Sequence, residues 1–194
     1  MKHPVHRSGW LLAGLLLAGL CACGGGGGGG PQASAGIATL VYTNPPPAGY
    51  RFVQNAQLSS ASHLVLDLVG PGGDQGRGIA FTLQMASGPV AWAMVSPTDT
   101  QFVQNVQFSL GPGIPLVKTA VADGVLQADL FQKGRGNAID LAGPLCRVAL
   151  DAQGPAAGAS AIPLQVVWFR RLPAAGAALV DATSSCSIGG LSVK

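Results

Sequence analysis

Glycine and proline interrupt this chain so often that a long helix has no room to form. The sequence holds 29 Gly and 14 Pro in 194 residues and contains no glutamate, so it is rich in helix breakers and lacks one strong helix former. After the first 36 residues, no window of helical length shows a 3.6-residue apolar period free of Gly or Pro. The chain is therefore restricted to short elements.

Short runs rich in β-branched, aromatic and alternating apolar residues lie between these breakers at a spacing of about ten residues. The stretch 70–78 is so rich in glycine that it predicts a turn. Many short strands separated by turns predict an all-β domain over 37–194, an antiparallel β-sandwich of the jelly-roll kind. The predicted strands are 37–43, 50–57, 63–69, 79–85, 90–95, 101–110, 116–121, 125–131, 145–150, 161–169 and 187–193.

The start of the chain has the features of an export signal. A short basic head with Lys2 and Arg7 precedes an apolar run from Trp10 to Leu20. This run fits the apolar core of a secretory signal and is too short to cross a bilayer as a helix.

Leu20, Ala22 and Cys23 resemble the lipobox of bacterial lipoproteins, in which a large aliphatic residue, any residue and a small residue precede a cysteine. Cys21 fits this pattern less well, because Leu20 would then stand where the motif has a small residue. An ordinary cleaved signal with incidental cysteines is the alternative.

The lipobox resemblance implies three parts: a signal peptide over 1–22, a lipidated Cys23 that begins a glycine-rich linker over 23–36, and the domain over 37–194. In lipoproteins an aspartate after the cysteine retains the protein in the inner membrane, whereas here Gly24 follows. The resemblance thus implies the outer membrane, with the lipid bilayer as one partner. Several acyl chains would make such an anchor effectively permanent.

Two cysteines remain in the domain once the signal has gone and Cys23 is acylated. In an oxidising compartment outside the cytoplasm, a remaining pair of thiols usually joins. Cys146 and Cys186 therefore predict a disulfide, with two buried free thiols as the alternative.

The segment 78–83 (GIAFTL) is similar to an early strand of the cohesin-like domains of bacterial surface proteins. The segments 126–131, 145–150 and 158–164 resemble later strands of that family in order and spacing. The resemblance implies a jelly-roll-like sandwich and a role in binding. It does not extend to the residues with which cohesins hold dockerins.

Few side chains could perform catalysis. His63 is the one histidine after the signal, and the chain has no Gly-x-Ser-x-Gly motif. Asp67, Asp129 and Asp140 are candidate carboxylates for glycoside hydrolysis, but aspartates at strand edges and turns are more often solvated or capping groups. We therefore expect no enzyme, no bound metal and no cofactor.

Trp92, Trp168 and Arg170 are the candidate ligand-binding residues. Exposed tryptophan beside arginine can stack on a sugar or anchor a protein partner. A tryptophan in an alternating strand can equally lie in the core.

The expected function is a non-catalytic, outer-membrane-anchored module that binds another envelope protein, as an accessory of secretion or surface assembly. A carbohydrate-binding module is the alternative, and a hydrolase is a weaker third. Nucleic acid is not expected as a partner, because nine basic residues face eight acidic ones once Lys2 and Arg7 are removed.

The tetrapeptide Phe-Val-Gln-Asn occurs twice, at 52–55 and 102–105. A duplicated half-domain and a coincidence between two half-buried strands both remain open.

Overall fold

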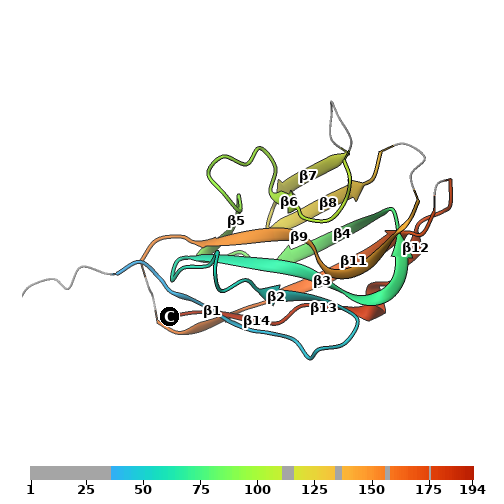
Figure 1. Cartoon of the computed structure of the whole chain (residues 1–194). Coiled ribbons are helices and arrows are strands. Elements are labelled where there is room, and N and C mark those ends of the chain that lie inside the picture. Colours follow the sequence, from blue (N-terminus) through green and yellow to red (C-terminus); the bar gives the residue numbers. More distant parts are fainter. Residues whose placement is uncertain (1–35, 111–115, 134–136, 156–157, 175) are drawn as a thin grey trace, which may run out of the picture. The chain divides into compact units, whose positions relative to one another are not determined.

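The regular structure in the described part of the chain is almost entirely β-strand, as the turn-rich sequence predicts. The computed structural model describes residues 36–110, 116–133, 137–155, 158–174 and 176–194 (Figure 1). One helical element occurs in this part, the 3-10 turn η1 (Thr183–Ser185). The all-β prediction is confirmed. The predicted signal peptide, Cys23 and the linker as far as residue 35 lie outside the described residues.

The larger sheet has six strands in the order β13-β2-β3-β9-β5, and β6 also pairs with β9. β13 runs parallel to β2, and the other pairs are antiparallel. β5 and β6 both pair with the same edge of β9, one after the other, and residues 94–102 between them leave the sheet. Its strands are β13 (Cys186–Ser187), β2 (Tyr50–Gln54), β3 (His63–Gly76), β9 (Ile139–Ala152), β5 (Val90–Ala93) and β6 (Val103–Asn105).

A five-stranded sheet has the order β12-β11-β4-β8-β7, and a three-stranded sheet has the order β1-β14-β10. Every pair in both is antiparallel. The five strands are β12 (Val180–Asp181), β11 (Leu164–Leu172), β4 (Gly78–Met85), β8 (Val125–Phe131) and β7 (Val117–Ala122). The three strands are β1 (Leu40–Thr43), β14 (Gly190–Val193) and β10 (Ser160–Ile162).

The prediction of a turn over 70–78 is wrong. β3 continues to Gly76 and stays paired with β9, with bulges between Leu68 and Val69 and between Pro71 and Gln75. A Cβ on Gly70 would lie 1.8 Å from the carbonyl oxygen of Leu141, so this glycine permits a close approach of two strands. Glycine marks a bulged, tightly paired strand here.

The predicted strand over 161–169 is in fact two strands in different sheets. β10 ends at Ile162 and β11 begins at Leu164, with Pro163 between them. Because proline has no N–H to donate, it ends one ladder and lets the chain cross to the next sheet.

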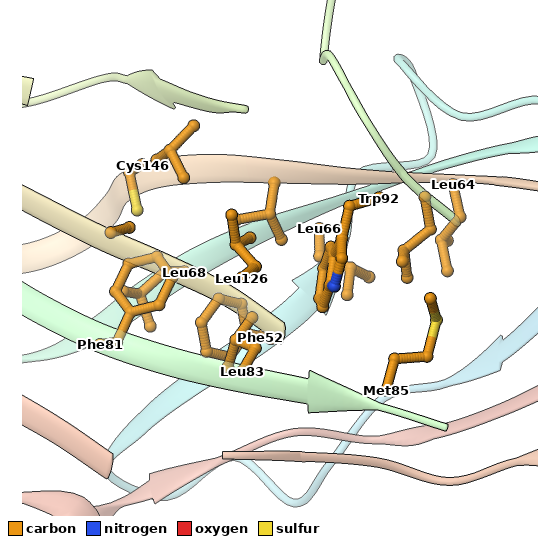
Figure 2. Packing of buried hydrophobic residues seen from close by; sticks show 14 of the residues in the cluster. Phe52, Leu64, Leu66, Leu68, Phe81, Leu83, Met85, Trp92, Leu126 and Cys146 are labelled. Carbon is orange, nitrogen blue, oxygen red and sulfur yellow. The ribbon is translucent and has the colours of Figure 1, made fainter. Parts of the chain in front are cut away.

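The core lies between the inner faces of the two larger sheets, which confirms the sandwich (Figure 2). Phe52 on β2 and Phe81 on β4 are both fully buried, and their ring centroids lie 5.6 Å apart at an interplanar angle of 74°. Leucines from β3, β4 and β8 fill the space around these rings. Burying each such side chain stabilises the fold by about 1.5–3 kcal/mol.

A second, small apolar cluster lies on the outer face of the six-stranded sheet. Val65 on β3 and Ala149 on β9 face each other across the pair and are fully buried. Val95, from the 94–102 segment that leaves the sheet, packs on both. This segment is therefore held against the outer face at its beginning.

Candidate functional site

The outer face of the five-stranded sheet brings together two of the three sequence-predicted ligand-binding residues. Trp168 is paired with Thr82, and Arg170 with Ala80. β8 places Gln127 opposite Thr82 and Asp129 opposite Ala80, and β7 places Lys118 opposite Asp129. We call this surface the Trp168 face; it comprises Trp168, Arg170, Ala80, Thr82, Gln127, Asp129 and Lys118.

Trp168 and Arg170 form a stacked pair. The guanidinium carbon of Arg170 lies 5.3 Å from the centroid of the Trp168 ring, within the range of a cation–π contact. Val167, at the bulge that precedes Trp168, is 45% exposed. An aromatic ring, a guanidinium and an apolar side chain are therefore gathered at one point of β11.

β4, the strand beside Trp168 and Arg170, carries two small side chains that are almost fully buried. Ala80 is fully buried and Thr82 is 4% exposed, although neither faces the main core. The hydroxyl oxygen of Thr82 is buried and has no hydrogen-bond partner among the described residues.

Charges alternate across the Trp168 face. Arg170 stands opposite Asp181 of β12 in the strand register. Hydrogen bonds from Thr183 hold the pKa of the Asp181 carboxyl below its usual value, and the charge of Arg170 lowers it further. At the β7–β8 edge of the face, burial raises the pKa of the Asp129 carboxyl, whereas the charge of Lys118, opposite Asp129 on β7, lowers it. The face thus offers both signs of charge.

Trp92 lies elsewhere. It is 7% exposed and packs in the core, with Leu64, Leu66 and Met85 nearby (Figure 2). Its Nε1 donates a hydrogen bond to the carbonyl oxygen of Gly124 over 2.8 Å. Trp92 and Trp168 therefore do not share one exposed face, and Trp92 takes no part in the Trp168 face.

Cys146 and Cys186 are free thiols in the structure, so the predicted disulfide is not formed there. β2 and β3 lie between the strands that carry the two cysteines. Three strand spacings amount to about 14 Å in a flat sheet. A disulfide needs Cα atoms within about 7 Å of each other. The sequence spacing of the two cysteines gives no sign of these intervening strands.

The candidate catalytic carboxylates do not form a pair. Asp67 bonds Arg147 on the six-stranded sheet, Asp129 lies on the five-stranded sheet, and Asp140 accepts from the backbone N–H of Gly73. Within the described part of the chain, no group of three or more His, Cys, Asp or Glu side chains could hold a metal ion.

His63 has an acidic partner that sequence reasoning missed. Its Nδ1 lies 2.6 Å from Oδ1 of Asp151, because β3 and β9 pair these two residues directly. They are 88 positions apart in the chain, and only the strand register brings them together.

Asp74 accepts a hydrogen bond from the Tyr50 hydroxyl over 2.8 Å and lies 3.8 Å from Nε of Arg171. Burial, together with the Asp74 carboxylate, raises the pKa of Tyr50. This group ties β2, β3 and β11 together, and we interpret it as structural.

Of the residues that the structure describes, none belongs to a helix with the length and hydropathy of a membrane span. No protein-family model and no curated protein matches the chain.

Proposed function

We propose that the protein is a non-catalytic binding module of a bacterial envelope, anchored by a lipid on Cys23, that holds a partner protein on the Trp168 face. The observation that carries this proposal is the Trp168–Arg170 stack beside the exposed Val167 on the outer face of the five-stranded sheet. The partner is a protein of a secretion or surface assembly.

The composition of the face supports a protein partner. Tryptophan and arginine are the residues most enriched among those that dominate protein–protein binding energies. Arg170 is stacked before binding, so less side-chain entropy is lost on association. The alternating charges of Arg170, Asp129 and Lys118 would determine how a partner is aligned on the face more than how tightly it binds.

Site-specific photo-crosslinking in living cells tests the face. A benzophenone amino acid at Gln127, which is exposed next to Thr82, is expected to give a discrete protein adduct. The same group at Gln153, an exposed residue after β9, serves as the control. Trp168→Ala or Arg170→Ala should abolish the Gln127 adduct. No adduct at Gln127, or equal adducts at both positions, would contradict the proposal.

Carbohydrate binding is the second candidate for the same face. Next to Trp168, the side chains of Gln165 and Gln84 form an exposed pair of amides, with Nε2 of Gln165 3.0 Å from Oε1 of Gln84. Rings and amides together are typical of sugar sites. Titration with soluble glycans that quenches Trp168 fluorescence, in a chain that gives no Gln127 protein adduct, would favour this candidate.

The lipid anchor has its own test. Cells fed radiolabelled palmitate should incorporate label into the wild-type chain and not into Cys23→Ser, which should leave the membrane fraction. Label in the Cys23→Ser variant would place the modification elsewhere, and no label in either chain would exclude the anchor.

A further inference from the structure

The five-stranded sheet ends at β7, which is a long and regular edge strand (Figure 1). Its six residues pair with β8 without a bulge. The other strands that end a sheet in the described structure have two to four residues each, and they are β1, β5, β6, β10, β12 and β13. Short edge strands are one way in which proteins avoid pairing with further chains. β7 lacks this protection.

Three residues of β7 direct their backbone groups away from the sheet. The N–H of Phe131 donates to the carbonyl oxygen of Leu116, and this bond sets the alternation of the β7–β8 ladder. Since only every second residue of an antiparallel strand bonds a given neighbour, the even-numbered residues of β7 bond β8. The N–H and C=O groups of Val117, Thr119 and Val121 point to the outer side. No backbone hydrogen bond joins these three residues to another described residue on that side.

The segment that precedes β6 contacts β7 through a side chain. Oγ1 of Thr119 accepts a hydrogen bond from the backbone N–H of Phe102 over 3.3 Å and donates to Oε1 of Gln101 over 2.7 Å. Val117 and Val121, which share a face of the strand with Thr119, pack against the core. These contacts are therefore made on the inner face of β7, and they leave its outward-pointing backbone groups unpaired.

A second copy of β7 fits this edge, because the three outward-pointing residues are evenly spaced. When two β7 strands pair antiparallel with Thr119 opposite its own counterpart, Val117 lies opposite Val121 of the other copy. Each of these residue pairs can then exchange both of its N–H···O bonds. A shift of the register in one direction would place Lys118 opposite Lys118. A shift in the other direction would bring Val117 opposite the turn residue Asp123, whose φ is 51°.

The side chains on the outer face of β7 fit the same register. Lys118 comes opposite Ala120 of the second copy, so like charges do not face each other directly. Leu116, which is 38% exposed although large and apolar, comes opposite Ala122 at both ends of the strand pair. Covering Leu116 would remove apolar surface from water. The edge is thus complementary to itself, as a two-fold symmetric contact requires.

We propose that the chain forms a two-fold symmetric dimer in which the two β7 strands pair antiparallel about Thr119 and join the two five-stranded sheets into one. A contact along one strand edge is small compared with the roughly 1,200 Å² at which stable interfaces begin, so the dimer is weak and reversible. The joined sheet presents both copies of the Trp168 face on the same side, and binding at one raises the effective concentration at the other. This consequence rests on the proposed function, whereas the dimer does not.

Disulfide trapping tests the register in cells that express two differently tagged full chains and are then treated with an oxidant. Lys118→Cys in one chain and Ala120→Cys in the other should give a mixed disulfide dimer, because these positions face each other. The same substitution in both chains puts the cysteines on a diagonal and should give at least about fivefold less dimer. Wild-type chains give the baseline for Cys23, Cys146 and Cys186.

Charge substitutions at Ala120 give a second readout, by sedimentation equilibrium of the purified full chain in detergent. Ala120→Lys sets a like charge opposite Lys118 and should weaken the dimer about tenfold, whereas Ala120→Glu should strengthen it by a similar factor. Gln127→Lys, which adds the same charge at an exposed position of β8 away from the edge, is the matched control and should leave the dimer unchanged.

Four outcomes would overturn the proposal. They are equal disulfide yields in all combinations, no disulfide dimer in any of them, adducts only to a different protein, and an Ala120→Glu dimer no tighter than the Ala120→Lys dimer. Neither readout depends on Trp168 or Arg170, so the dimer and the partner protein of the Trp168 face can fail separately.

Discussion

Arg147 on β9 donates from Nε to Oδ1 of Asp67 on β3 over 2.9 Å. Each partner has a further hydrogen bond: Asn55 Nδ2 donates to Asp67 Oδ2, and Arg147 Nη1 donates to Gln104 Oε1. Asn55 and Gln104 belong to the two Phe-Val-Gln-Asn segments, which therefore flank the β3–β9 pair from opposite sides. The segments are shifted by one residue, because Phe52 is buried in the first and Val103 in the second. The repeat thus does not place equivalent residues in equivalent positions.

The Asp67–Arg147 pair should be worth more than an exposed ion pair. Asp67→Asn is expected to lower the free energy of unfolding by about 1–3 kcal/mol, because it leaves a half-buried guanidinium without its charged partner. The double variant Asp67→Asn/Arg147→Gln should lose less than the sum of the two single losses. Urea unfolding measures all three. Strictly additive losses would show that the two residues do not stabilise each other.

The hairpin between β7 and β8 depends on Gly124. Asp123 and Gly124 both have positive φ, at 51° and 76°, as a two-residue turn of this kind requires. A Cβ on Gly124 would lie 2.4 Å from the carbonyl oxygen of Met85. Gly124→Ala should therefore cost about 1–3 kcal/mol by thermal unfolding. Gly88→Ala, where the added Cβ meets only Ile162 Cδ1 at 3.7 Å, should be close to neutral.

The two domain thiols should be unreactive in the folded protein. Burial raises the pKa of the Cys186 thiol to about 12, and it also raises the pKa of Cys146. At pH 8 the thiolate of Cys186 is then scarce enough to slow alkylation by more than about a thousandfold relative to an ordinary cysteine. Kinetics with a chromogenic thiol reagent measure this. In denaturant without reductant, both thiols should react; a chain that takes up no reagent at these positions would contain the disulfide after all.

Stability should depend on pH through Asp129. Its pKa in the folded state is raised above the ordinary value of 3.8, chiefly by burial. The folded state therefore holds the proton more tightly than the unfolded state, and the stability this gives at low pH is lost as pH rises through that range. Asp129→Asn should accordingly gain stability relative to wild type on going from pH 3 to pH 7. A difference that is constant with pH would contradict this reasoning.

Strand positions could be predicted because they depend on local chemistry. Residues 79–85 and 125–131 match β4 and β8 within one residue, since breakers bound them on both sides. The stretch 70–76 could not be identified as strand, because its glycines permit a close approach to Leu141 that no local pattern records. Pro163 was visible in the sequence, but that it separates two sheets depends on what β10 and β11 pair with.

The residue types of the candidate site could be predicted from the sequence, but the sheet face on which each residue lies could not. Trp92 and Trp168 both stand in alternating strands, and only the pairing of those strands puts one in the core and the other on an outer face. His63 and Asp151 meet through a register set by fourteen-residue strands. A single strand carries no information on which residue lies across from it.

The segment from Val180 to Val193 gives one strand to each of the three sheets: β12, β13 and β14. β14 is the central strand of its sheet, so β1 and β10 have nothing to pair with until Val193 has been synthesised. The three-stranded sheet can therefore form only after β14 has been made, although β1 and β10 are synthesised earlier. For the export that we propose, such a delay is useful, because a polypeptide whose three-stranded sheet forms late remains able to thread through a translocation channel.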